Sequence, residues 1–87
     1  MTDTQRPITF YCTMWCSDCR RARRFLDERG TAYRCVDIDE DAEAAAFVKQ
    51  VNHGLRSVPT LVFHDGSILV EPSDAQLAAR LREQGLG

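Results

Sequence analysis

The order of the first three elements constrains the fold of this chain more than any other feature. A short apolar run at residues 8–11 has the pattern of a strand. An amphipathic stretch then predicts a helix from about Ser17 to Arg29, and residues 32–38 have the composition of a second strand. Because strand–helix–strand units close with a right-handed crossover, the two strands are expected to be parallel neighbours in one sheet.

The rest of the chain predicts a second helix, a hairpin and a third helix. Apolar residues at helical spacing follow the acidic stretch at 37–43 and stop near Gly54. Residues 60–63 and 67–70 are strand-like, and Asp65-Gly66 between them is typical of a two-residue turn. Ser73 and Gln76 have the spacing of a capping box. The expected fold is therefore α/β, a four-stranded mixed sheet with three flanking helices.

Length and charge narrow the class of protein. The 87 residues predict one domain, 1–87, in which the polar residues 1–7 form a flexible N-terminal extension. The net charge of −2 gives no indication of a nucleic-acid partner. Because no segment resembles a signal peptide or a membrane span, we expect no membrane partner and a cytoplasmic location. We also expect a monomer. In a reducing cytosol, cysteines act in catalysis or metal binding more often than as structural disulfides.

A pair of cysteines, Cys16 and Cys19, lies between the first strand and the first helix. Cys16 is expected about one turn ahead of the helix, where unpaired N–H groups and the helix dipole favour a reactive thiolate. Cys19 is expected inside the first turn, less exposed, as the thiol that closes a disulfide with Cys16. The spacing and the strand–turn–helix context favour redox chemistry over half of a metal site.

Several other residues are candidates for binding a substrate. Trp15 precedes Cys16 and is either a flat wall for a substrate or a partly buried anchor. Arg20 belongs to an arginine cluster that is either solvated surface or a source of positive charge for the thiolate or an anionic group. Val58-Pro59 precedes the third strand, and a cis bond there would let the Val58 backbone pair with an extended substrate.

Cys12 and Cys35 are harder to interpret. With the Cys pair they would make a four-thiolate metal site conceivable, so a metal or iron–sulfur module is an alternative function. Cysteine is, however, among the most often buried residues, and both positions are expected to be structural. His53 and His64 lack the spacing of zinc ligands, and we predict no metal site.

Three motifs are linked in this chain. They are Trp15-Cys16-Ser17-Asp18-Cys19-Arg20-Arg21-Ala22, Ser57-Val58-Pro59-Thr60 and Asp65-Gly66-Ser67. Together they resemble the glutaredoxin branch of the thioredoxin superfamily, and within it the mycoredoxins, which use mycothiol. The likeness runs from residue 8 to residue 81. The resemblance implies a thioredoxin/glutaredoxin fold with Pro59 in the cis form.

The resemblance also implies an activity, a thiol–disulfide oxidoreductase that reduces protein–mycothiol mixed disulfides. Cys16 would attack the mixed disulfide, and a second mycothiol or Cys19 would then release it. Thr13, Trp15, Arg20, Val58 and Pro59 are the expected substrate-binding residues. Mycothiol would be a co-substrate, with no bound cofactor. The partners would be mycothiolated or disulfide-bonded proteins, with mycothione reductase as an indirect electron source.

Departures from the glutathione-dependent members support this expectation. Thr13 stands in the region where those proteins carry a lysine, and Glu71-Pro72 stands where they carry Gly-Gly. The alternative within the same superfamily is a redoxin that thioredoxin reductase reduces and that donates electrons to ribonucleotide reductase. The segment Ser73-Asp74-Ala75-Gln76 does not match the C-terminal segment often found in such redoxins.

Overall fold

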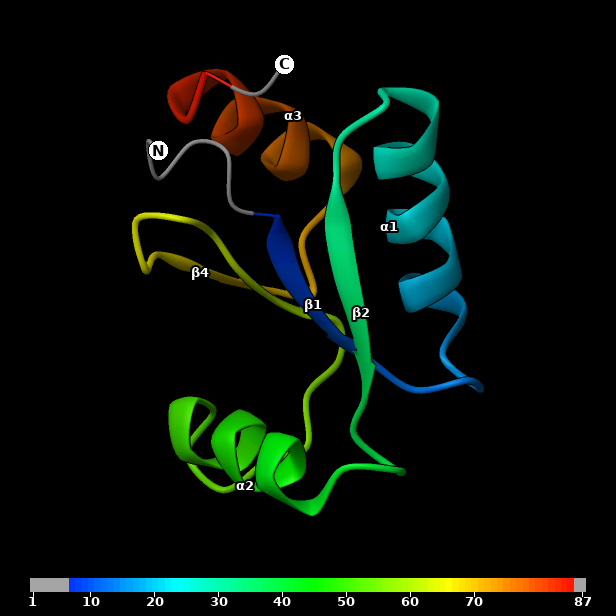
Figure 1. Cartoon of the computed structure of the whole chain (residues 1–87), viewed down its shortest axis with the longest axis vertical. Coiled ribbons are helices and arrows are strands. Elements are labelled where there is room, and N and C mark those ends of the chain that lie inside the picture. The colour runs from blue at the N-terminus through cyan, green and yellow to red at the C-terminus, as the bar shows by residue number, and fades with distance from the viewer. Residues whose placement is uncertain (1–6, 86–87) are drawn as a thin grey trace.

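The computed structural model describes residues 7–85, which form a sheet with helices on both faces (Figure 1). Of the expected N-terminal extension, only Pro7 falls within this range. The elements follow the predicted order. They are β1 (Ile8–Cys12), α1 (Ser17–Glu28), β2 (Tyr33–Asp37), α2 (Ala42–Val51), β3 (Thr60–Val62), β4 (Ile68–Val70) and α3 (Asp74–Glu83).

The sheet is mixed, with the strand order β2-β1-β3-β4. β1 and β2 are parallel, as a strand–helix–strand unit requires, and β3 is antiparallel to both β1 and β4. The expected four-stranded mixed sheet with three helices is therefore confirmed. β2 lies at one edge of the sheet, so its outer side has no strand partner among the described residues.

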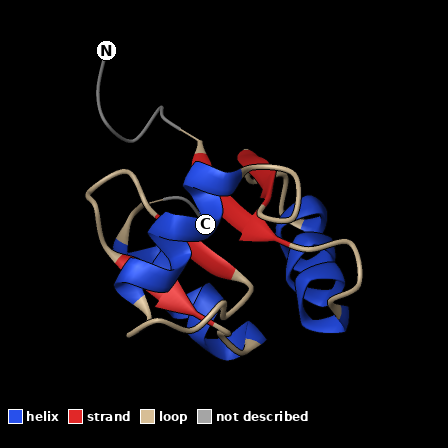
Figure 2. Cartoon of the chain, turned by 90° about the horizontal axis from the view of Figure 1, so that it is seen from below, coloured by secondary structure: helices blue, strands red, loops and turns tan. Residues whose placement is uncertain are grey.

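The helices divide between the two faces of the sheet, as Figures 1 and 2 show. α1 and α3 bury apolar side chains against one face, and α2 packs against the other. The first cluster comprises Ile8, Phe10, Cys12, Cys19, Ala22, Leu26, Leu61, Phe63, Leu77 and Leu81. The second comprises Ile38, Ala44 and Val48, with Tyr11 and Val36 packed against it. β1 contributes to both clusters because alternate side chains of a strand point to opposite faces.

Most element ends agree with the sequence signals. Gly30 follows α1 with a φ of 67°, a left-handed conformation that costs glycine little. The Ser73–Gln76 capping box is present at the start of α3. The hairpin connection is also where the sequence predicts it, because Phe63 N–H donates to Ser67 O and leaves His64, Asp65 and Gly66 as the loop. Gly66, with a φ of 86°, closes this loop in a left-handed conformation.

Within residues 7–85, no helix has both the length and the apolar character needed to cross a membrane.

Candidate active site

Cys16 is the N-cap of α1, directly before the first helical residue. The expectation that it precedes the helix by a turn is therefore wrong. The backbone N–H of Cys19 donates to Cys16 Sγ at 3.1 Å, so the sulfur takes the place that a serine or aspartate oxygen usually has at this position. The N–H bond and the positive end of the helix dipole both stabilise negative charge on this sulfur.

Cys19 is fully buried in the first turn of α1, behind Cys16. Burial raises the pKa of the Cys19 thiol to about 12, and its hydrogen bond to the Cys16 sulfur acts in the same direction. A backbone hydrogen bond from Thr13 opposes this shift. The two thiols are therefore adjacent but unlike, with an accessible sulfur at the helix end and a protonated one beneath it.

The Val58-Pro59 segment lies beside Cys16, although it is far away in the sequence. The Cys16 thiol donates to the Val58 carbonyl oxygen at 3.7 Å, and the Val58–Pro59 bond is cis, as the resemblance implied. Val58 is half-buried and Pro59 is buried. A hydrogen bond from the start of β3 also holds this loop, because Thr60 Oγ1 donates to Ser57 O at 2.7 Å.

Asn52 is a buried residue of this site that the sequence analysis did not identify. Its side-chain amide donates to Val48 O at 2.8 Å and to Thr60 Oγ1 at 3.3 Å. It thereby connects the end of α2 to the loop that carries Val58. A polar residue just past an amphipathic helix is usually exposed, so the sequence carried no signal for this role.

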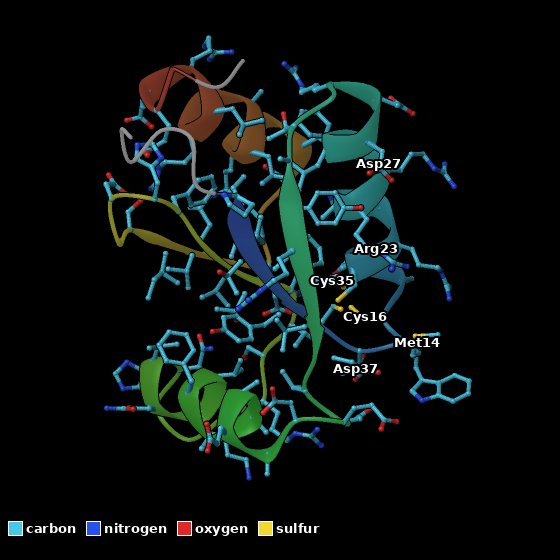
Figure 3. The ribbon with its side chains drawn as sticks, in the orientation of Figure 1. Met14, Cys16, Arg23, Asp27, Cys35 and Asp37 are labelled. Carbon is cyan, nitrogen blue, oxygen red and sulfur yellow. The ribbon has the colours of Figure 1, made fainter. Side chains whose placement is uncertain are left out.

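The loop from β1 to α1 exposes its two large apolar residues. Trp15 is 85% exposed and Met14 is 67% exposed, and Figure 3 shows Met14 on the same loop as Cys16. The interpretation of Trp15 as a partly buried anchor is therefore wrong. An exposed tryptophan next to an accessible sulfur fits the other expectation, an apolar surface for a substrate.

The arginines of α1 lie in different environments. Arg20 is exposed. Arg21 forms an ion pair with Asp74 and donates to Pro72 O at 2.9 Å, which joins α1 to the start of α3. A cleft of about 430 Å³ opens here, starting at Asp18 and bounded by Arg21 and residues 71–74 and 76. It begins two residues along α1 from Cys16.

Cys12 and Cys35 have opposite environments. Cys12 is buried at the end of β1, and burial together with the neighbouring Cys35 raises the pKa of its thiol. Cys35 is exposed, so the expectation that it is a buried structural cysteine is wrong. The physical reason is its position on β2, the edge strand. All four cysteines are free thiols in this structure.

The described residues do not favour a metal module. Among residues 7–85, no three histidine, cysteine or acidic side chains are grouped so that they could hold a metal ion. An accessible sulfur that receives an N–H bond, with a second thiol in contact, is instead suited to thiol–disulfide exchange.

Comparison with known proteins agrees with this chemistry. A glutaredoxin family model matches residues 8–68. The chain is 45% identical over 74 residues to a Mycobacterium tuberculosis protein provisionally named a glutaredoxin, covering 85% of this chain and 88% of that protein. It is 40% identical over 74 residues to Mycoredoxin 1 of Corynebacterium glutamicum, covering 85% of this chain and 91% of that protein.

Solved structures show the same fold. A mutant of a thioredoxin-like protein superposes with a TM-score of 0.75 at 27% identity, covering 85% of this chain and 97% of that one. A glutaredoxin of Archaeoglobus fulgidus superposes with a TM-score of 0.71 at 23% identity, covering 90% of this chain and 88% of that one. The cysteine that caps α1 and the cis-proline loop beside it thus lie in a chain whose sequence matches the glutaredoxin family model and a mycoredoxin. The chain belongs to the glutaredoxin family.

Proposed function

We propose that this glutaredoxin-type protein reduces mixed disulfides between proteins and mycothiol, with Cys16 as the nucleophile. The observation that carries the proposal is the position of Cys16 at the N-cap of α1, where its sulfur accepts the Cys19 N–H bond. The similarity to Mycoredoxin 1 supports mycothiol as the thiol concerned.

The first step is an attack by the Cys16 thiolate on the mycothiol sulfur of the mixed disulfide. The protein–mycothiol S–S bond breaks, the target protein leaves as its thiolate and takes up a proton, and mycothiol stays on Cys16. The Val58 backbone beside Cys16 supports an extended arrangement of the bound thiol, in the manner of an added strand. Trp15 and Pro59 would provide apolar contact next to the sulfur, with Thr13 in the same loop.

The second step releases mycothiol from Cys16, either by a second mycothiol or by Cys19. Cys19 contacts Cys16, but its raised pKa keeps it mostly protonated at neutral pH. A second mycothiol therefore has the advantage as the attacking thiol, since thiolates attack and thiols do not. The cleft at Asp18 and Arg21 has room for the polar part of a thiol held on Cys16, and the exposed Arg20 is available for an anionic group.

The test compares Cys16→Ser and Cys19→Ser in the reduction of a mycothiol mixed disulfide, with Cys35→Ser as a control on the exposed strand. We expect Cys16→Ser to lose activity to background, and we expect Cys19→Ser and Cys35→Ser to remain active when mycothiol is supplied. Full activity of Cys16→Ser would show that another group is the nucleophile. Loss of activity in Cys19→Ser would show that the internal disulfide is obligatory.

The electron donor is tested in the same assay with mycothiol, glutathione or thioredoxin reductase. We expect turnover with mycothiol, regenerated by mycothione reductase. Rapid turnover with thioredoxin reductase and none with mycothiol would favour the redoxin alternative, in which ribonucleotide reductase is the electron acceptor.

A further inference from the structure

Cys12 and Cys35 form a second thiol pair that the Cys16–Cys19 chemistry does not use. On the parallel strands β1 and β2, Phe10 is paired with Cys35 and Cys12 with Asp37. Cys12 and Cys35 are therefore diagonal neighbours, and both side chains lie on the α1 face because alternate residues of a strand share a face. Cys35 contributes to the raised pKa of the Cys12 thiol, and that thiol donates to Val36 O at 3.7 Å.

The two thiols differ in access in the same way as the catalytic pair. Cys12 is 4% exposed, whereas Cys35 is exposed at the edge of the sheet. Figure 3 shows Cys35 on β2 and Arg23 on α1 on the same side of the sheet. The positive charge of Arg23 reaches Cys12. An accessible thiol thus lies next to a buried one, in the same order as in the catalytic pair.

We propose that Cys12 and Cys35 are a second redox-active dithiol, which a low-molecular-weight disulfide oxidises to an intramolecular disulfide. The Cys35 thiolate attacks one sulfur of the disulfide, forms a mixed disulfide and releases one thiolate. Burial and the neighbouring Cys35 keep Cys12 protonated, but Cys35 is neutral once it is part of the mixed disulfide. Cys12 can then lose its proton and attack the Cys35 sulfur, so that the mixed disulfide breaks and the second thiolate leaves. The protons from Cys35 and Cys12 go to the two leaving thiolates. The pair loses two electrons, and the small disulfide is reduced to two thiols.

The geometry makes this disulfide reversible. Parallel strands lie about 4.8 Å apart and rise about 3.3 Å per residue, so residues offset by two positions have Cα atoms about 8 Å apart. A relaxed disulfide spans at most about 6.8 Å. Closing the bond would shift the middle of β2, where Cys35 lies, relative to β1, which an edge strand permits because no further strand holds its outer side. Strained disulfides are easily reduced. Because Cys12 is the last residue of β1, its movement would be passed to the loop that leads to Cys16.

The test is the mass of the intact wild-type chain after treatment with bis(2-hydroxyethyl) disulfide. We expect the mass of the chain to fall by four hydrogens, with no reagent attached, which corresponds to two internal disulfides. Dithiothreitol should restore the original mass. Digestion with trypsin and chymotrypsin together cuts between Cys12 and Cys16 at Trp15, and it should then link peptide 12–15 to peptide 35–47. The control is Cys35→Ser, which keeps the fold because the side chain is exposed. It should lose only two hydrogens, with Cys12 still a free thiol.

Three results would overturn the proposal. The first is a wild-type chain that loses only two hydrogens and keeps Cys12 and Cys35 reduced. The second is a stable adduct of the reagent on Cys35 that Cys12 does not resolve. The third is a disulfide from Cys35 to Cys16 or Cys19. Since the measurement uses no mycothiol, its outcome is independent of the thiol that the catalytic pair uses.

Discussion

At the scale of single residues, burial and hydrogen bonding separate four chemically identical side chains. Cys16 and Cys35 are accessible, whereas Cys12 and Cys19 are buried and have raised pKa values. In the reduced chain at pH 7, we therefore expect iodoacetamide to modify Cys16 and Cys35 first. Cys19, with its pKa raised to about 12, should react slowly because it is both protonated and shielded.

The raised pKa of Cys19 also determines how its alkylation depends on pH. A raised pKa means that the Cys19 thiolate forms only as the pH approaches about 12, so an increase from pH 7 to pH 9 should leave Cys19 slow. Peptide mapping after timed alkylation measures each site. In guanidinium chloride all four cysteines should react at similar rates. Labelling of Cys19 as fast as Cys16 in the folded chain would contradict this account.

The sequence predicted some of these residues and not others, for a physical reason. The positions of Cys16 and Cys19 depend on local signals, a strand followed by a helix start, so the sequence placed the pair at this junction but set Cys16 a turn too far from the helix. The exposure of Cys35 depends on strand order, and nothing local in the sequence shows that β2 is at the edge. Trp15 is exposed, although a large aromatic residue is usually at least partly buried, so its residue type alone does not indicate this position.

At the scale of elements, the connection from α2 to β3 determines where Val58 stands. α2 ends at Val51, and Asn52 caps it and reaches Thr60 at the start of β3. Thr60 in turn holds Ser57, next to Val58. The two elements could be predicted from apolar spacing, but the buried polar link between them could not, since it joins residues through the tertiary structure.

The variant Asn52→Ala tests this link. It removes two buried hydrogen bonds, so we expect the free energy of unfolding to fall by about 1–3 kcal/mol. Urea unfolding measures the change, and Gln50→Ala, at an exposed position of α2, is the matched control and should leave stability almost unaltered. An equal, small effect of both substitutions would show that the Asn52 link does not stabilise the connection.

At the scale of the whole molecule, one sheet joins two hydrophobic clusters. Leu81 of α3 lies in the cluster that α1 and α3 form, and Val48 of α2 lies in the cluster on the other face. β1 supplies Phe10 to the first cluster and Tyr11 to the second. If either cluster lost its packing, one face of β1 would be exposed, and the other cluster would lose the support of the same strand. The two faces should therefore unfold together.

This cooperativity can be tested with one substitution on each face. Leu81→Ala should lower the free energy of unfolding by about 2–5 kcal/mol, and Val48→Ala by about 2 kcal/mol. Both should shift one transition that is the same by fluorescence and far-ultraviolet circular dichroism, because a small domain of this kind unfolds in one step. Leu55→Ala, at a side chain that is 64% exposed, is the control and should leave the transition in place. Two separate transitions in Val48→Ala, with α2 melting before the other helices, would show that the second cluster is an independent unit. A single shifted transition would mean that packing on the α2 face also secures β1, and with it the loop that carries Cys16.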